Sequence, residues 1–420
     1  MPAAPSFDAA LPLNVSLRFF LTAPLFGMLA AIWFMMTGAE IMLSRWHPAT
    51  LAWVHLLTLG FMLQTMVGAV LQLLPVVAGV RLPSPVRLTA LIHGLLVIGT
   101  LTLAAAFYWP NGGLSILAWV SLLLAFAITL AMVGYGWRAT GVRDDTAIAI
   151  AMAVLGLIVT IGLGSMLFGY RNGWWSLKWI GMTRLHVAWG LVGWTAMLVL
   201  GVAMTVVPMF IGARRLPVWL ERLQAPILLL MLVLWSLVQS GWSGRLAQAM
   251  VALVMIGLAG RWLWAIAKSR RPIDVTRRFW QLGLLSFMFA AMVFSLSLPG
   301  LNPATEHWML GVLLIDGFAI SIICGMLYKI VPFLVWLHLT QASQRRFAVP
   351  NVKQLMRTTT VVWHWRLHLV CLMLLLIAPW LERWGRLIGL PLLAAHMLLG
   401  WNLYYPIRRY RSALLVIRLA

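Results

Sequence analysis

Long apolar runs separated by short polar stretches dominate the chain. About 30 Å of hydrocarbon needs roughly 20 consecutive helical residues to cross it. Runs of that length recur along the whole sequence, and none alternates between apolar and polar positions as a strand would. Only helices satisfy the backbone of such runs in lipid. The pattern predicts twelve transmembrane helices, over residues 19–43, 49–79, 88–109, 114–137, 146–168, 182–212, 225–240, 246–266, 279–299, 307–338, 359–380 and 385–406.

Composition places the entire chain in a bilayer. Of its 420 residues, 63% are hydrophobic and only 10% are charged, whereas a soluble domain carries about 25% charged residues. We therefore expect an all-α, polytopic integral membrane protein in which residues 1–420 form a single membrane domain surrounded by lipid. The first twenty residues lack the basic start and cleavage site of a secretory signal, so the first apolar run is predicted to be a retained helix.

The formal net charge of +22 has two possible meanings. A basic protein often binds nucleic acid, but the basic residues here lie in short loops between apolar runs and form no stripe on a soluble domain. Alternate loops are rich in them, as in the segments around 268–278 and 408–418, while the intervening loops hold few. The positive-inside rule then predicts an inner-membrane protein with both termini cytoplasmic, and no nucleic-acid partner.

One pattern occurs three times. HLLTLGFMLQTMVGAVLQLLP, which begins at His55, recurs as HVAWGLVGWTAMLVLGVAMTVVP from His186 and as HWMLGVLLIDGFAISIICGMLYKIVP from His307. In each copy a glycine precedes the closing proline by seven residues, and the copies are about four helices apart. The sequence therefore predicts three pseudo-symmetric four-helix units, at approximately 15–140, 145–270 and 275–406.

The three histidines are the candidate chemistry. A polar side chain at membrane depth costs free energy unless it finds a partner, and neutral imidazole is a common metal ligand. Three histidines at equivalent places on equivalent helices favour ligation, and an ordinary hydrogen-bonded core role is the alternative. His55, His186 and His307 are the predicted metal ligands, near the outer face of the membrane.

These residues resemble heme-copper oxidase subunit I. That family has twelve helices in three pseudo-symmetric arcs, both termini inside and metal centres toward the outer face. The run from His55 through Pro75 and Gly79 is similar to its second helix, especially in the nitric oxide reductase branch, and His307 with Gly325 and Pro332 is similar to its tenth. The resemblance implies a b-type heme with His55 and His307 as axial ligands. It implies that His186 is a third ligand, for copper or a second heme.

The sequence also departs from that family. The predicted seventh helix, APILLLMLVLWSLVQSG, holds no histidine, and the tenth lacks a His-x-His pair. A complete binuclear site is therefore expected to be absent. The chain is similar in length and helix number to the NnrS family, heme- and copper-containing membrane proteins connected with nitric oxide metabolism.

Other polar residues in the apolar runs are secondary candidates. Asp316 lies deep in the tenth helix, where it could move protons or pair with a cation. Glu306 could orient the imidazole of His307, and Arg184 could bind a heme propionate. His364 and His368 share one helix face at metal-ligand spacing, but their place near a helix end favours an interfacial role.

The expected function is heme b binding with electron transfer, redox sensing or a nitric oxide-related role, served by a redox partner such as a cytochrome c or another subunit. Whether the protein is an enzyme is left open. The alternatives are a heme-free proton-coupled transporter or permease, in which Asp316 couples to protons, and a non-catalytic scaffold or assembly subunit.

Overall fold

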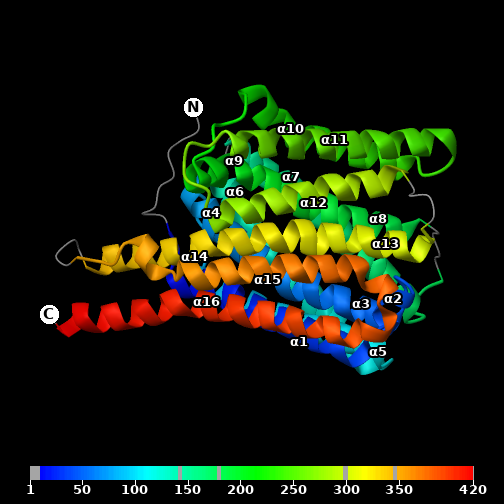
Figure 1. Cartoon of the computed structure of the whole chain (residues 1–420), viewed down its shortest axis with the longest axis horizontal. Helices are drawn as coiled ribbons and strands as arrows, with labels where there is room; N and C mark the ends of the chain where they lie inside the picture. Colours follow the sequence, from blue (N-terminus) through cyan, green and yellow to red (C-terminus); the bar gives the residue numbers. More distant parts are fainter. Residues whose placement is uncertain (1–9, 141–143, 177–180, 297–300, 344–347, 420) are drawn as a thin grey trace.

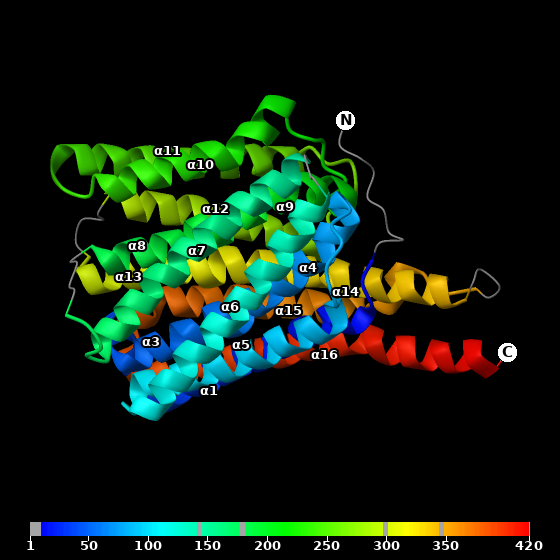
Figure 2. The ribbon, with the colours of Figure 1, turned by 180° about the vertical axis from the view of Figure 1, so that it is seen from behind.

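A bundle of long helices makes up the protein (Figure 1). The computed structural model describes residues 10–140, 144–176, 181–296, 301–343 and 348–419, and within these it contains helices and connecting turns but no strand. Twelve helices are long and apolar enough to cross a membrane. They run side by side along the long axis of the molecule, as the view from behind also shows (Figure 2). The predicted all-α, multi-pass membrane protein is confirmed.

Among the described residues, nine of the spanning helices are single α-helices. Four short helical elements lie between some of the long helices. The short elements are α2 (Glu40–Leu43), η6 (Val352–Leu355), η7 (Ala378–Trp380) and η8 (Glu382–Trp384). The long ones are α1 (Leu13–Thr37), α5 (Pro85–Tyr108), α6 (Gly112–Thr140), α7 (Asp145–Arg171), α10 (Val218–Leu237), α11 (Gly241–Ala267), α12 (Val275–Leu296), α15 (Thr358–Ile377) and α16 (Gly385–Leu419).

The other three spanning helices are composite, and they are the ones that carry the repeated histidine pattern. We call them helix 2, helix 6 and helix 10. In each, a π-helical segment interrupts the α-helix and begins one, three or six residues after the histidine, a feature often found at functional sites. Helix 2 comprises α3 (Pro48–His55), η2 (Leu56–Leu63) and α4 (Gln64–Ala78); helix 6 comprises α8 (Met182–Ala188), η3 (Trp189–Ala196), α9 (Met197–Val206) and η4 (Val207–Ile211); helix 10 comprises α13 (Pro303–Val312), η5 (Leu313–Ile320) and α14 (Ser321–Ala342).

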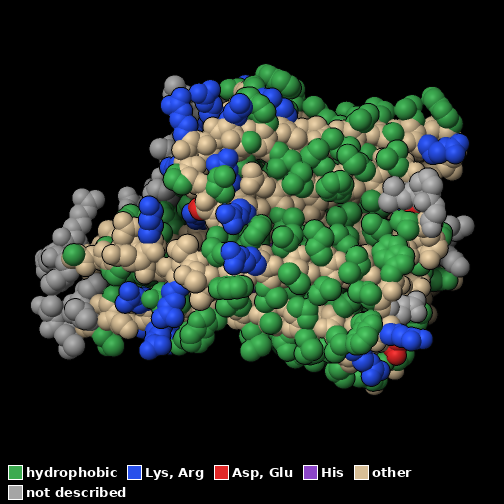
Figure 3. Space-filling model, viewed as in Figure 1, with side chains coloured by type: hydrophobic (Ala, Val, Ile, Leu, Met, Phe, Trp, Pro, Cys, Tyr) green, Lys and Arg blue, Asp and Glu red, His purple; other side chains and the backbone are tan. Residues whose placement is uncertain are grey.

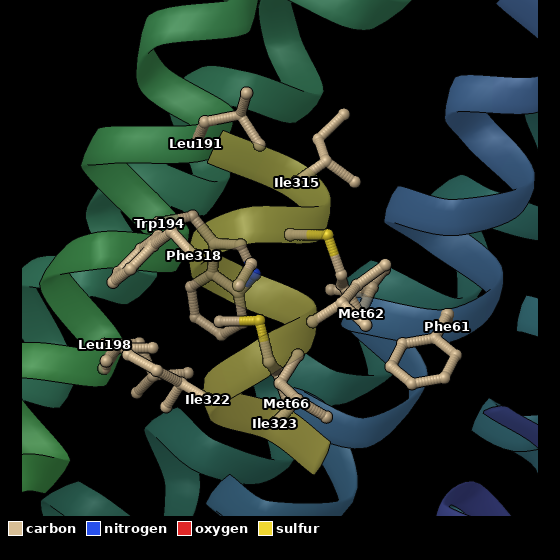
Figure 4. Packing of buried hydrophobic residues seen from close by; sticks show 14 of the residues in the cluster. Phe61, Met62, Met66, Leu191, Trp194, Leu198, Ile315, Phe318, Ile322 and Ile323 are labelled. Carbon is tan, nitrogen blue, oxygen red and sulfur yellow. The ribbon is translucent and has the colours of Figure 1, made fainter. Parts of the chain in front are cut away.

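Helices 2, 6 and 10 are the buried centre of the bundle. Within their most apolar windows 72%, 72% and 83% of the residues are buried, against 33–56% for the other nine. The π-helical segment η5 contacts both η2 and η3. Apolar side chains from the three helices meet there, among them Met62, Trp194 and Phe318 (Figure 4). The helices that carry the repeat therefore lie mainly inside the bundle, although His307 itself is exposed.

Several helix boundaries differ from the prediction, for local reasons. Helix α1 ends at Thr37 because Gly38 takes a positive φ of 58°, which few other residues adopt without strain. Helix 10 starts at Pro303, where Asn302 caps it by accepting a hydrogen bond of 2.8 Å from the Thr305 amide. Helix α16 continues to Leu419, beyond the predicted end at 406, because hydropathy marks only the part of a helix that lipid covers.

Charge separates the two ends of the bundle. Lysines and arginines gather at the end where α14 and α16 project, and apolar side chains cover the flank between the ends (Figure 3). The opposite end, where α3, α8 and α13 begin, carries fewer basic residues on this face. The first described helix starts and the last one finishes at the basic end (Figure 1).

Candidate cofactor site

A cavity of about 760 Å³ lies between helices 2, 6 and 10, near the end at which all three begin. Sites for cofactors and similar ligands are concave, mostly apolar and roughly 300–1,000 Å³ in volume. The walls here are largely leucine, valine, phenylalanine and tryptophan, and all three predicted ligands, His55, His186 and His307, line them. The fold thus brings the three repeated histidines to one cavity.

His55 is fixed by its own helix. Its Nδ1 lies 2.7 Å from the carbonyl oxygen of Leu51, one turn earlier. A carbonyl only accepts, so Nδ1 carries the proton and Nε2 keeps its lone pair. Phe107 of α5 packs beside the ring, with 5.0 Å between the ring centroids. Nε2 has no hydrogen-bond partner among the described residues, and the residue lines the cavity.

His186 is fixed in the same way, but by a neighbouring helix. Its Nδ1 donates to the carbonyl oxygen of Thr160 on α7 at 3.1 Å, which again leaves a lone pair on Nε2. The ring sits over Gly164, where an added Cβ would come within 2.9 Å of the imidazole Cε1. A glycine at this place on α7 is therefore what makes room for the ring.

The two rings oppose each other across part of the cavity. Their centroids are 6.4 Å apart and their planes differ by 18°. The two rings are therefore near-parallel neighbours that line the same cavity. A metal-bound histidine characteristically donates its other ring N–H to a carbonyl or carboxylate, and both His55 and His186 do so.

His307 lies elsewhere on the cavity wall and is exposed. Its neighbour Trp308 stacks on Trp53 of helix 2, with 5.4 Å between the ring centroids and 14° between the planes. The indole of Trp308 also donates to the carbonyl oxygen of Leu375 at 2.7 Å. Tryptophans, and not histidines, thus make the contact between helices 2 and 10 at this level.

Charged residues gather at one part of the same cavity. Arg45, Arg171, Arg184 and Glu306 all line it. Burial and the nearby guanidinium of Arg184 lower the pKa of Arg45, which precedes helix 2. Arg171 donates from Nη2 to the carbonyl oxygen of Phe107 at 3.0 Å. Three arginines against one glutamate make this part of the cavity attractive to carboxylates.

The cavity has an apolar floor. Met62, Leu191, Trp194 and Ile315 line it, and below them the packing continues into side chains such as Phe318, which is completely buried (Figure 4). Asp316 does not line the cavity. It is buried beyond the floor, and its Oδ2 has no hydrogen-bond partner among the described residues.

The structure shows which contacts the secondary candidates make. Lys329, which the sequence places too far from Asp316 to pair with it, pairs with Asp274, with 2.5 Å between Nζ and Oδ2. No hydrogen bond joins Glu306 to His307 in the described part of the chain, so the predicted orienting role of Glu306 finds no support. Arg184 lies over the ring of Trp235, 5.7 Å from its centroid, and lines the cavity as the propionate assignment requires.

A second histidine group was missed by sequence reasoning. His364 and His368 on α15 are 1% and 4% exposed, so the interfacial role predicted for them is wrong. His396 on α16 is buried as well. His368 Nε2 shares a hydrogen bond of 2.7 Å with the hydroxyl of Ser321. The signal available in the sequence was the spacing of four, which placed both rings on one face, here the inward face.

The described residues include no group of three or more His, Cys, Asp or Glu side chains arranged to hold a metal ion. A bare ion such as Zn²⁺ takes about four ligands, at least three of them from protein. A metal that arrives with its own equatorial ligands, as heme iron does, needs only axial ligands. The histidines of the cavity could serve a metal of this second kind as axial ligands.

Fold and site define an all-α multi-pass membrane protein with a histidine-lined central cavity. No known family model and no curated protein matches the chain. Its likeness to heme-copper oxidase subunit I stays a prediction from the sequence.

Proposed function

We propose that the protein binds heme b in the central cavity and serves electron transfer or redox sensing, as a divergent member of the heme-copper oxidase subunit I type. The observation that carries this proposal is a cavity of about 760 Å³ lined by three histidines and three arginines. The apolar walls suit the porphyrin face, the histidines suit its iron and the arginines suit its propionates. Bound heme would supply one-electron chemistry.

The proposed protein ligands come from the histidines His55, His186 and His307. The arginine-rich part of the cavity is where a redox partner, such as a cytochrome c or another subunit, would approach the heme edge. A nitric oxide-related role requires that one axial position be left open or be displaceable. Copper remains a prediction, because His186 has no group of further ligands around it in the described chain.

Heme content tests the proposal. Protein purified from cells with ample heme should show the reduced-minus-oxidised bands of heme b and close to one heme per chain by pyridine hemochromogen assay. A metal analysis of the same sample shows whether the protein also binds copper. The proposal fails if this protein carries no heme and the apoprotein takes up no added hemin.

A variant that places a side chain in the cavity tests where hemin binds, and a variant outside the cavity is its control. An added Cβ at Gly311 meets nothing within 4 Å, and Gly311 lines the cavity, so the side chain of Gly311→Leu should project into the cavity and weaken hemin binding. Gly134 is exposed and equally open, so Gly134→Leu should bind hemin normally. Equal hemin binding by both variants would place the heme outside this cavity.

A heme-free proton-coupled transporter is the second candidate, and Asp316 favours it. This carboxyl is 3% exposed and one of its oxygens is unpaired, which is unusual for a structural residue at membrane depth. Heme-free protein whose reconstituted vesicles acidify, with the acidification abolished by Asp316→Asn, would support it.

The predicted topology and repeat also belong to the proposal. We place both termini on the cytoplasmic side of an inner membrane, supported by the basic residues at that end (Figure 3). Labelling of Ser269→Cys from the inside and Ser240→Cys from the outside tests this. Three four-helix units are supported by the equivalent π-helical segments of helices 2, 6 and 10. In an experimental structure, rotating one unit onto the next should superimpose the three histidines.

A further inference from the structure

We infer that the axial pair is His55 and His186, on helices 2 and 6, and not the pair on helices 2 and 10 that the resemblance implies. This inference rests on the proposed heme function and names the ligands of that site. It assigns His307 to the cavity mouth, away from the iron.

The distance between the rings supports this pair. Metal–imidazole nitrogen bonds are about 2.0–2.1 Å. The centroid of an imidazole ring lies roughly 1.1–1.2 Å from Nε2. Two such distances and two metal–nitrogen bonds in line place the ring centroids about 6.3 Å apart. The observed separation of His55 and His186 is 6.4 Å. The spacing of the ring centroids thus matches the spacing that a metal bound to both rings requires.

The hydrogen bonds leave the right nitrogen available on both rings. Nδ1 of His55 is committed to the Leu51 carbonyl, and Nδ1 of His186 is committed to the Thr160 carbonyl. Each ring therefore keeps the tautomer with a free Nε2 lone pair. These bonds also hold the ring orientation before any ligand arrives, which lowers the ordering cost of binding.

The geometry of helix 2 turns His55 away from helix 10. Successive residues of an α-helix are 100° apart, so Trp53 and His55 lie about 200° apart around the axis. Trp53 faces helix 10, because it stacks on Trp308. His55 consequently lies on the opposite side of helix 2, where Phe107 and His186 are its ring neighbours.

The nature of the ion follows from the ligand count. Two imidazoles alone are too few for a structural zinc or copper site, and no group of three or more potential ligands occurs in the described chain. Iron in a tetrapyrrole has four equatorial ligands already, so two opposed histidines complete six-coordination. The inferred site is a low-spin, bis-histidine heme, and the near-parallel ring planes predict a rhombic low-spin EPR signal.

Single variants of the purified full-length protein, loaded with hemin, test the inference. His55→Ala and His186→Ala should each lose low-spin character and bind hemin more than about tenfold more weakly, since even groups that only hydrogen-bond a metal ligand are worth roughly 10- to 100-fold. His307→Ala separates the two candidate pairs: it should stay low-spin if His186 is the second ligand and lose the low-spin spectrum if His307 is. His93→Ala is the matched control, because His93 does not line the cavity.

Two further variants guard against misfolding. Imidazole added to His186→Gly should restore the low-spin spectrum. His186→Met supplies a different axial atom and should raise the midpoint potential. If instead His307→Ala turns high-spin while His186→Ala stays low-spin, the inference is overturned and the heme proposal stands. If the wild type takes up no hemin, the heme proposal itself has failed.

Discussion

Two groups of histidines, one half-buried beside the cavity and one fully buried, differ in what surrounds their ring nitrogens. His55 and His186 line a cavity, with Nδ1 held by a carbonyl and Nε2 left free. His364 and His368 are packed against Phe279, with 5.6 Å and 5.5 Å between the ring centroids, and neither lines that cavity. Burial alone does not make a histidine a candidate ligand, whereas a fixed tautomer with a free Nε2 beside a cavity does.

The fully buried histidines, which we call the packed group, carry a free-energy cost of folding that the cavity pair, His55 and His186, does not. Nδ1 of His364 and Nδ1 of His396 are buried and lack a hydrogen-bond partner in the described chain. A buried polar atom without a partner typically costs about 1–3 kcal/mol. We therefore expect changes near the cavity pair to alter cofactor binding and changes near the packed group to alter stability.

Gly164→Ala should have the largest effect. Its new Cβ would lie 2.9 Å from Cε1 of His186, so the ring must move and hemin affinity should fall roughly 10- to 100-fold. At Gly162 an added Cβ meets nothing within 4 Å, which makes Gly162→Ala the control. Hemin titration of the two apoproteins measures the difference; equal affinities would remove His186 from the site.

Gly27→Ala should act on stability instead. The added Cβ would lie 2.4 Å from Nδ1 of buried His396, and overpacking of this kind costs about 1–3 kcal/mol. Unfolding in detergent should show the loss, whereas Gly94→Ala, which meets nothing within 4 Å, should not. Heme per folded chain should stay constant, and a loss of heme at unchanged stability would contradict the comparison.

Ser321→Ala should have a smaller effect of the same kind. It removes the hydroxyl that pairs with His368 Nε2 and leaves a buried nitrogen unsatisfied, at about 1–2 kcal/mol. The double variant with His368→Leu should recover part of this loss, because both polar groups are then gone. A shifted heme spectrum in Ser321→Ala would show that the packed group communicates with the cofactor.

Arg184→Gln should have the smallest effect, on cofactor retention alone. Arg184 lines the cavity but is exposed, and an exposed ion pair contributes about 0.2–1 kcal/mol, so hemin affinity should fall roughly twofold to fivefold. The difference should vanish with hemin dimethyl ester, which has no carboxylates. Arg245 does not line the cavity, and Arg245→Gln should bind both forms as the wild type does.

The helices themselves could be read from the apolar runs, because lipid imposes both their length and their satisfied backbone. The repeated histidine pattern also falls on the three most buried helices. The π-helical segments left no recognisable signal, since they depend on how neighbouring helices pack. The role of His364 and His368 was misjudged because a position near a helix end does not reveal which side the helix presents to the bundle.

Hydropathy and spacing are properties of the chain, so they were enough to predict an all-helical, multi-pass membrane protein and to single out three histidines at the starts of apolar helices. Only the tertiary structure decided that the three share one cavity, and that His55 stands opposite His186 at 6.4 Å. That outcome depends on the rotation of helix 2, which the Trp53–Trp308 stack defines, and on the space left by Gly164 on another helix. The first depends on a contact between residues 255 apart in the sequence, and the second on a contact between two different helices. No local pattern reveals either contact.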